Sequence, residues 1–446
     1  MNDIEIMYSE QQLIDIAAMV LAEAKRLGVD QAEVNIAANK GFSVAAHNND
    51  VERIEYNQNK VVDITVLINH CMGSTSVTDF NKESIEKAVL AACHIAKFTD
   101  QDPASGLADR DDLAFHYPQI DLAKRWPISV EEAIQLACAC EREALSIDHR
   151  LVSAEEVLVS TNEARCVYAN SHGFIGGYPS TSHEINCVLI AKDKDDMQRD
   201  YSYTISADPS LLLSTSAVAK DAAARTLNRL GAKQLSTMKA PVIFYAEEAR
   251  SLIGHFASAI TGGALYRKAS FLLDQLDQAI FPEFIDIQEF PHLAMALGSA
   301  PFDSDGVATR NNKFIEHGVL RQYALGTYSA RKLGMKTTGN AGGYHNLTVK
   351  TSDFDFKALL KKMDKGLLVT ELMGQGVNII TGDYSRGAAG FWVEHGEIQY
   401  PVHEITVAGN LRDIYKRIVA VGNDVDRRGN VLTGSILIDE MMIAGA

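Results

Sequence analysis

Several features that would assign a chain to a class at once are missing from this sequence of 446 residues. No apolar run approaches the ~18 residues of a membrane-spanning helix. The start, Met1–Glu5, is acidic where a signal peptide needs positive charge. No block of Lys and Arg offsets the net charge of −16, which disfavours binding to a phosphate backbone. We therefore expect a cytoplasmic protein with neither a membrane nor a nucleic-acid partner.

Cysteine is also scarce, and all six cysteines lie in the first 187 residues. Such sparse use suits a reducing compartment, with the thiols serving as small buried apolar groups. The one close pair, Cys138 and Cys140, falls in a helical pattern. Residues two apart on a helix point to different sides, so we expect no disulfide or shared metal there.

Glycine divides the chain unevenly, because 8 of the 31 glycines lie in residues 1–235 and 23 lie in residues 236–446. Glycine favours tight turns and close backbone approach. The pattern predicts an α+β fold with a Gly-rich, β-rich C-terminal domain over residues 236–446. The N-terminal half, which mixes helices and strands, divides into subdomains at 1–110 and 111–235, joined by a proline-containing connector over residues 101–127.

Local patterns in the first half predict individual helices and strands. Ser9 with Gln12, and Ser129 with Glu132, form capping boxes that open helices ending near Leu27 and Ile147. Apolar spacing predicts helices over 83–97 and 217–230. Strands and helices follow one another without strict βαβ alternation, which favours α+β over a doubly wound fold. The expected strands cover residues 33–36, 51–56, 62–68, 165–169 and 184–190.

Familiar catalytic motifs are approached but not matched. The segment His183–Cys187 approaches the zinc-protease motif H-E-x-x-H, with a cysteine in place of the second histidine. Its surroundings predict a strand, where residues four apart lie ~13 Å from each other, too far to share one metal ion. The segment Gly382–Gly387 resembles a serine-hydrolase elbow around Ser385, except that Asp383 replaces the first glycine of the motif. No Walker loop and no G-x-G-x-x-G string occurs. Zinc-protease, serine-hydrolase and nucleotide-binding motifs are thus all incomplete.

A different set of strings carries a family resemblance. In order along nearly the whole chain, they are Asn170–Gly173, Arg199–Tyr203, Leu235–Pro241, Tyr266–Ser270, Pro301–Gly306, Tyr328–Gly334, Thr370–Gly376, Gly382–Trp392 and Glu397–Asn410. Together they resemble the TldD/PmbA family, and within it the PmbA (TldE) branch. The resemblance implies a two-component cytoplasmic metalloprotease that acts on unfolded or peptide substrates. The family's older name is "modulator of DNA gyrase".

The chain departs from the catalytic pattern of that family. The resemblance implies that the catalytic sister subunit carries H-E-x-x-x-H on the helix after the first strand of the C-terminal domain, and a metal-binding cysteine near the C-terminus. The matching stretch, Glu248–Gly263, holds one histidine, His255, with Phe256 where the glutamate would follow. No cysteine occurs after Cys187. We therefore expect no catalytic residue, no metal and no cofactor bound by this chain, with zinc held by the partner subunit.

Three functions of different classes remain open. The favoured one is a non-catalytic scaffold or substrate-channel subunit of a heteromeric metalloprotease. The second is an autonomous hydrolase that uses residues such as Asp383, Ser385 or His345. The third is a regulatory binding protein of the gyrase-modulator type.

The favoured function requires a surface that holds an extended peptide and a surface that holds the partner. Addition of a strand to a sheet edge gives sequence-tolerant affinity, and Gly-rich segments allow close backbone approach. We expect a TldD-type partner, unfolded peptide substrates, and a homodimer when the chain is alone. The candidates for contact with peptide or partner are Gly374, Gly376, Asp383, Ser385 and Gly387, and, in a loop that could line a channel, Asn340 and His345.

Overall fold

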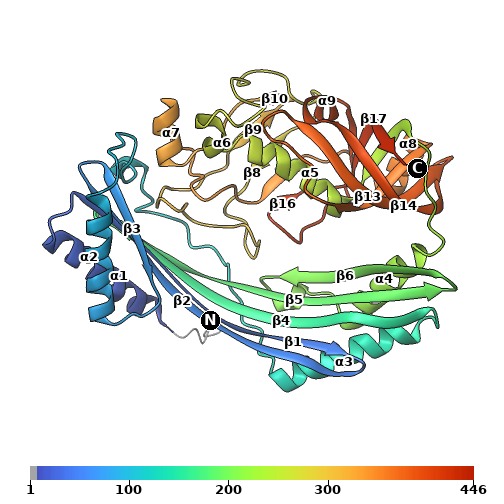
Figure 1. Ribbon diagram of the computed structural model, residues 1–446, viewed down its shortest axis with the longest axis horizontal. Helices are drawn as coiled ribbons and strands as arrows, with labels where there is room; N and C mark the ends of the chain where they lie inside the picture. The colour runs from blue at the N-terminus through green and yellow to red at the C-terminus, as the bar shows by residue number, and fades with distance from the viewer. Residues whose placement is uncertain (1–7, 446) are drawn as a thin grey trace.

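The computed structural model describes residues 8–445, so the acidic start at residues 1–5 lies outside the described part of the chain. Within residues 8–445, no helix has both the length and the apolar character needed to cross a bilayer. A long curved sheet forms the N-terminal half, and the C-terminal half lies over its concave side (Figure 1). The expected mixed fold, with a β-rich C-terminal part, is confirmed.

One antiparallel sheet runs through the whole N-terminal half in the order β3-β2-β1-β4-β5-β6. β1 pairs with β4 over residues 33–46, so the regions before and after residue 110 share this sheet. The strands are much longer than the apolar patterns indicate, because ladders on both sides satisfy the backbone even where side chains are polar. Their bounds are β1 Gln31–His47, β2 Asp50–Ile68, β3 Cys71–Val77, β4 Leu151–Asn170, β5 Ile175–Asp193 and β6 Asp196–Ser206.

Helices cover the convex face of this sheet. The capping boxes of Ser9 and Ser129 are confirmed, and each of the four expected helices agrees with the structure to within about two residues. Val34 and Val62 pack beneath the first pair of helices, and Val159 and Leu189 beneath the second. The helices are α1 Glu10–Arg26, α2 Lys82–Ala96, α3 Val130–Ser146 and α4 Thr215–Asn228, with short 3-10 turns at Arg110–Asp112 and Pro209–Leu211.

The C-terminal half contains a sheet in the order β14-β13-β12-β7-β17-β15, which an extra β14–β17 pairing closes on itself. Gly390 shows why glycine is needed, since a Cβ there would lie 1.9 Å from the carbonyl oxygen of Leu368 on the neighbouring strand. The bounds are β7 Met238–Phe244, β12 Gly366–Met373, β13 Asp383–Glu394, β14 Glu397–Asn410, β15 Ile418–Val421 and β17 Ile436–Ala444.

A second, smaller sheet has the order β10-β9-β8-β11-β16. Its strands are β8 Ile287–Glu289, β9 Lys313–Glu316, β10 Val319–Leu320, β11 Leu347–Val349 and β16 Val431–Leu432. The helices of this half are α5 Ala246–Ala259, α6 Gly262–Tyr266, α7 Thr327–Leu333, α8 Phe356–Met363 and α9 Leu411–Lys416.

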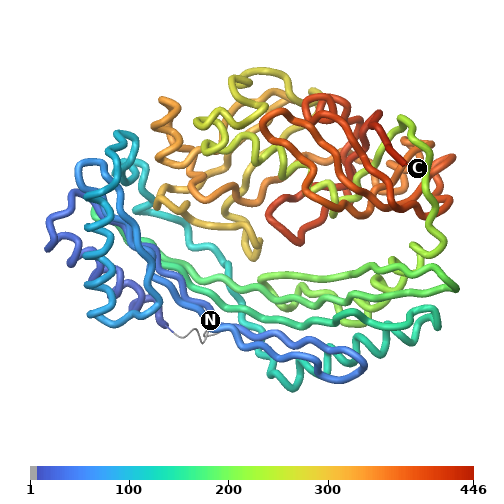
Figure 2. Tube along the Cα trace, viewed as in Figure 1, coloured from blue at the N-terminus to red at the C-terminus, as the bar shows by residue number. Residues whose placement is uncertain are grey.

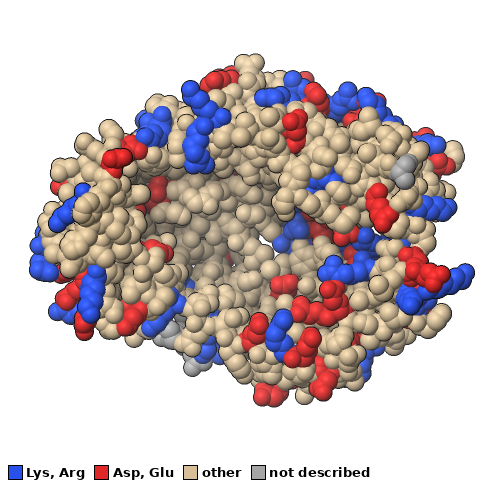
Figure 3. All heavy atoms as spheres, viewed as in Figure 1, with Lys and Arg blue, Asp and Glu red and all other residues tan. Residues whose placement is uncertain are grey.

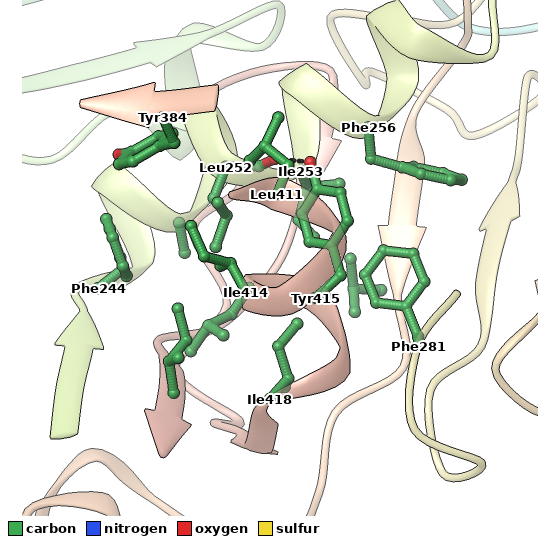
Figure 4. Packing of buried hydrophobic residues seen from close by; sticks show 14 of the residues in the cluster. Phe244, Leu252, Ile253, Phe256, Phe281, Tyr384, Leu411, Ile414, Tyr415 and Ile418 are labelled. Carbon is green, nitrogen blue, oxygen red and sulfur yellow. Dashed lines mark hydrogen bonds between the residues drawn. The ribbon is translucent and has the colours of Figure 1, made fainter. Parts of the chain in front are cut away.

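The core of the C-terminal half forms where α5 and α9 meet the closed sheet (Figure 4). Tyr415 on α9 stacks on Phe281 at 4.7 Å between ring centroids and donates a 3.0 Å hydrogen bond to the carbonyl of Leu252. Tyr384 on β13 meets the edge of Phe244 on β7. This packing fixes α5, the helix that contains Glu248 and His255.

The segment His183–Cys187, which approaches a zinc-binding motif, lies on β5, and the sequence predicts a strand there. The imidazole is fully buried, with Nδ1 2.8 Å from the Thr161 hydroxyl and Nε2 2.8 Å from the Lys124 carbonyl. His183 is therefore a hydrogen-bonded core residue. All six cysteines are free thiols, Cys138 and Cys140 both buried, so neither forms the disulfide that the sequence also argues against.

Several polar contacts join the halves, and two groups of them contain buried or charged side chains that bear on the site. Glu247 on α5 accepts hydrogen bonds from Tyr201 at 2.7 Å and from Arg225 and Arg428 at 3.1 Å each; we call these four residues the joint network. Burial by itself would raise the pKa of Glu247, but the two arginines and Tyr201 hold it below its ordinary value.

The second set of contacts lies at α7. Tyr328 donates to Asp102 at 2.8 Å, and Arg331 donates to the carbonyls of Gly106 and Leu107. The connector of residues 97–129 thus runs between the two halves, which can be followed along the trace in Figure 2. These contacts close the molecule around a central hollow.

Candidate functional site

The hollow between the halves is open on the face drawn in Figure 3, and most of its visible wall carries neither acidic nor basic side chains. Its floor is the concave face of the N-terminal sheet. Since alternate residues of a strand face opposite sides, and Val34 and Ile36 lie under helices, Asn35 and Asn39 face the hollow. The same argument places Ser160 and Asn162 of β4 on this floor. An extended polar surface results, rich in amide and hydroxyl groups.

A cluster of polar side chains lies where α5 packs against β13, on the helix for which the sequence predicts a departure from the metal motif. Glu248 and His255 of α5, with Tyr384 and Arg386 of β13, form what we call the α5 centre. Arg386 donates to the Ser251 hydroxyl at 2.9 Å and to the Leu372 carbonyl at 3.3 Å. The ring of His255 meets that of Tyr384 edge-on at 6.0 Å. His255 Nε2, Tyr384 Oη and Arg386 Nε are buried without a hydrogen-bond partner among the described residues.

The electrostatics of this centre oppose a cation. Burial, together with the charge of Arg386, lowers the pKa of His255 to about 4. Burial, with the charge of Glu247, raises the pKa of Glu248 to about 7. The imidazole is therefore neutral at neutral pH, beside a guanidinium that repels metal ions.

The zinc implied by the family does not fit these residues. A structural or catalytic zinc site takes three or four His, Cys, Asp or Glu ligands. No group of three such side chains able to hold an ion occurs anywhere in residues 8–445. At the α5 centre only two side chains are of a ligand type, the imidazole of His255 and the carboxylate of Glu248, and the other two members are an arginine and a tyrosine.

Five of the predicted contact residues come together around the β12–β13 connection. Gly374 lies there with a φ of +78°, and the Gly376 carbonyl accepts the Ser385 amide at 2.7 Å. A Cβ on Gly376 would lie 1.9 Å from the Ser385 carbonyl oxygen, so this glycine is required by the hairpin itself. Gly387 pairs with Met373 across the two strands, and Asp383 projects to solvent.

These residues do not form a nucleophile with a base. Asp383 accepts hydrogen bonds from the Thr381 hydroxyl at 2.6 Å and from the Asn410 amide at 3.1 Å, which lower its pKa below the ordinary value. The Ser385 hydroxyl is exposed and makes no hydrogen bond within residues 8–445, whereas an activated serine needs a base within hydrogen-bond reach. The surface suits contact with another chain better than catalysis.

The other two predicted residues lie in a separate network around the buried Glu289 of β8. Asn340 donates to both carboxylate oxygens of Glu289, at 2.8 and 3.0 Å, and Asn312 donates to one at 2.7 Å. The Nδ1 atom of His345 lies 2.9 Å from Glu289. Asn340 is itself buried, so it positions its loop, whereas His345 also lines a cavity of about 170 Å³ that opens toward Tyr168 and Asp303.

Sequence patterns missed the carboxylates that face the hollow. Glu33 lies in an ordinary alternating strand, and Asp303 and Asp305 belong to the string Pro301–Gly306, which was noted only as a family feature. Both Glu33 and Asp305 line a cavity of about 710 Å³ between the halves. A single charged residue in a strand carries no signal of its partner across the fold, so only the structure brings them together.

Comparison with known proteins supports the same architecture over the whole length. Family models for the PmbA/TldA metallopeptidase match domain 1 at residues 32–96, the central domain at 124–230 and the C-terminal domain at 237–445. The chain is 47% identical to the Metalloprotease PmbA of Escherichia coli O157:H7, covering 98% of this chain and 97% of that protein. The chain belongs to the PmbA/TldA metallopeptidase family.

Solved structures agree with this assignment. A candidate modulator of DNA gyrase from Bacteroides thetaiotaomicron matches with a TM-score of 0.93 and 26% identity, covering 99% of this chain and all of that one. TldE from Thermococcus kodakarensis shares the fold, with a TM-score of 0.81, 17% identity, and 96% and 100% of the two chains covered. A Metalloprotease TldD homolog of Buchnera aphidicola is 22% identical over 63% of each chain.

Proposed function

We propose that this chain is the PmbA/TldE-like, non-catalytic subunit of a cytoplasmic, heteromeric zinc metalloprotease that processes unfolded peptides. In this proposal a TldD-type partner binds the zinc and cleaves the peptide. This chain supplies part of the surface along which the peptide is held.

The observation that carries the proposal is the chemistry of the α5 centre. A zinc protease needs an open metal site and a glutamate base beside it. Here the one imidazole is buried against Tyr384 and faces the positive charge of Arg386. In this proposal the metal motif of the TldD-type partner lies on the helix equivalent to α5, and this chain has no group of three metal ligands within residues 8–445.

The hollow and its floor support the second half of the proposal. Amide and hydroxyl groups such as those of Asn35, Asn39 and Ser160 can bond to any main chain, so they tolerate many sequences. The exposed β12–β13 connection, with Asp383 and Ser385, offers a separate surface for the partner subunit. Both TldD-type and TldE-type proteins occur among the relatives of this chain, as a two-component enzyme requires.

Reconstitution tests the proposal directly. The isolated chain should release no fragments from an unfolded fluorogenic peptide, and a mixture with a TldD-type subunit should cleave it until a chelator is added. Elemental analysis of the separate subunits should find about one zinc per TldD-type chain and none in this one. Cleavage by the isolated chain that resists a chelator would contradict the proposal and favour an autonomous hydrolase.

Matched variants locate the chemistry. Replacing His255→Gln in this chain should leave cleavage by the mixture within twofold, because His255 belongs to no group of three metal ligands within residues 8–445. Replacing one motif histidine of the TldD-type subunit should abolish it. A large loss from His255→Gln, with zinc also lost, would place the metal in this chain and overturn the proposal.

Association gives a further check. Light scattering should show a homodimer of the isolated chain, and mixing should convert it into a heteromer. A stable assembly of this kind commonly buries ~2,000 Å² or more. Asp383→Lys, which reverses the charge of an exposed side chain on the β12–β13 connection, should weaken the mixed assembly if this surface holds the partner.

A regulatory role is the second candidate, favoured by the gyrase-modulator description of the Bacteroides structural relative. It becomes the better proposal if the TldD-type subunit is fully active alone and this chain changes neither rate nor peptide affinity.

A further inference from the structure

The cavity of about 710 Å³ at one end of the hollow is built from three separate parts of the chain. Glu33 and Leu67 come from the concave face of the N-terminal sheet, and Asp102 comes from the connector. Asp305 and Lys332 come from the C-terminal half. We call it the acidic cavity. It exists only when the two halves are docked.

Two carboxylates of this cavity keep unused bonding capacity. Glu33 accepts one hydrogen bond, from the Tyr168 hydroxyl at 2.8 Å through Oε2, and no described residue bonds to Oε1. Asp305 accepts one, from the Thr327 amide at 2.8 Å through Oδ2, and Oδ1 has no partner in residues 8–445. Both side chains are partly buried and line the cavity. Their remaining oxygens can therefore accept hydrogen bonds from a ligand that enters it.

Other buried carboxylates of this molecule show the contrast. Glu247 is bonded to two arginines and a tyrosine, as described above. Glu289 is bonded to two asparagines and lies beside a histidine. Asp303, the neighbour of Asp305, accepts backbone amides from residues 305, 307 and 341. Elsewhere the fold provides donors for its buried acids, but at Glu33 and Asp305 it leaves the remaining sites directed at a cavity.

The charge and the apolar surface of the other lining residues indicate which kind of ligand fits the acidic cavity. The only basic side chain among the residues that line the cavity, all of which lie in the described range, is Lys332, and it is already paired with Asp102 at 2.8 Å. The cavity is therefore negative overall. Apolar walls stand beside the carboxylates, formed by Leu67, Met72 and Leu107. A cationic head on an aliphatic stem would satisfy both parts, with the stem along the apolar wall and the head against the acids.

We propose that the acidic cavity binds the lysine or arginine side chain of an extended peptide lying in the hollow. Glu33 and Asp305 take the ammonium or guanidinium group, and Leu67 and Met72 contact its stem. The inference deepens the proposed function, on which the peptide as ligand rests, by making basic side chains the preferred feature of the substrate. Asn35, two residues along β1 from Glu33 and on the same face, would bond the main chain of that peptide.

Peptide binding to the full, isolated chain tests this without the partner or zinc. The probes are fluorescein-labelled decapeptides of Gly, Ser and Asn with one central residue, which is lysine, arginine, norleucine or glutamate. Anisotropy is measured at pH 8, above the pKa of about 7 to which burial raises Glu33, so that the carboxylate is ionised. The lysine and arginine peptides should bind at least tenfold more tightly than norleucine, and the glutamate peptide should bind most weakly.

Variants of the two acids should remove this preference. Glu33→Gln keeps an acceptor for the Tyr168 hydroxyl, and Asp305→Asn keeps one for the Thr327 amide, so each retains its internal bond. Each should weaken the lysine peptide about tenfold and leave the norleucine peptide unchanged. The matched control is Glu184→Gln, a carboxylate on β5 whose position faces the same hollow outside this cavity; it should not alter the preference.

Three results would overturn the inference. One is equal binding of the lysine and norleucine peptides to the unaltered chain. Another is an unchanged preference in a folded Glu33→Gln or Asp305→Asn variant; if one variant fails to fold, the other decides. The third is displacement of the peptide by 1,5-diaminopentane at a concentration equal to that of the free peptide, which would make a small amine the ligand.

Failure of the inference and failure of the proposed function are distinguishable. Loss of the preference with intact, chelator-sensitive cleavage by the mixed subunits would remove only the cavity's role. If the preference for basic peptides is retained but the mixture cleaves nothing, the proposed role as a protease subunit is wrong, and the cavity remains a peptide-binding site.

Discussion

The α5 centre and the acidic cavity are both polar regions in the interior of the molecule, but the charges that surround their titratable groups are of opposite sign. At the α5 centre the neutral His255 faces the cation Arg386, inside a tightly packed helix–strand contact. In the acidic cavity Glu33 faces another acid, Asp305, across open volume. The α5 centre is therefore closed and unsuited to cations. The region suited to cations lies where no motif marks it, between the two halves.

The largest expected effect comes from weakening the joint network, which helps to hold the two halves of the chain together. Glu247→Gln leaves Arg225 and Arg428 buried with one partner fewer, and should cost about 3 kcal/mol of unfolding free energy. Glu248→Gln, one residue along the same helix, is the control. It should change stability by less than about 1 kcal/mol, because Glu248 has no ion pair in the described structure. Urea unfolding of both variants measures the difference in unfolding free energy. Equal losses in the two variants would contradict a specific contribution of the joint network to stability.

Stability against pH should reveal the acid–acid contact at Glu33. Burial first, and then the charge of Asp305, raises the pKa of Glu33 to about 7, while the Tyr168 hydroxyl opposes this rise. Between pH 4.5 and 7 the folded chain therefore holds a proton that the unfolded chain has lost, so stability falls as pH rises. Glu33→Gln should remove a fall of about 3 kcal/mol at most. Parallel stability curves for variant and parent between pH 5 and 8 would contradict it.

At the α5 centre, the contribution of His255 to stability should change with pH in the opposite direction, over an overlapping range of pH. Burial lowers the pKa of His255 to about 4, so between pH 6.5 and 4 the unfolded chain binds a proton that the folded chain does not. His255 therefore makes stability fall as pH decreases through that range, by about 3 kcal/mol at most. His255→Gln should flatten this acid limb and leave stability above pH 7 nearly unchanged. Subtracting each variant's curve from the parent's separates this contribution from those of Glu33 and Glu248.

The smallest expected change in stability comes from Gly254, and it tests how tightly α5 is packed at that position. Gly254 lies inside the helix, and a Cβ added there would meet nothing within 4 Å. Gly254→Ala should therefore stabilise the chain by about 0.5–1 kcal/mol through helix propensity. A loss of stability in thermal unfolding would mean that the position beside His255 is more crowded than the structure indicates. Gly390→Ala, where the added atom would meet the Leu368 carbonyl, should destabilise and serves as the contrast.

Local sequence signals predicted local structure well and long-range contacts poorly. The capping boxes at Ser9 and Ser129 involve residues three apart, so their helices could be located from the chain alone. The strands were predicted too short, because residues such as Asn39 and Asn59 gain their strand geometry from pairing with each other across the sheet. The candidate residues behaved similarly: those within a few positions, such as Gly376 and Ser385, came together, whereas His345 proved to belong to a network built around the distant Glu289.

What the sequence by itself determined was the family, the mixed fold with its Gly-rich second half, and the absence of the H-E-x-x-x-H ligand pattern around His255. Each of these depends on the identity or order of neighbouring residues, which the chain states directly. Only the tertiary structure decided that burial, together with the charge of Arg386, lowers the pKa of His255 and keeps it neutral. It alone brought Glu33 and Asp305, some 270 positions apart, to the same cavity. A charge acts over a few ångströms through space, and the distance along the chain does not reveal which charges the fold will place together.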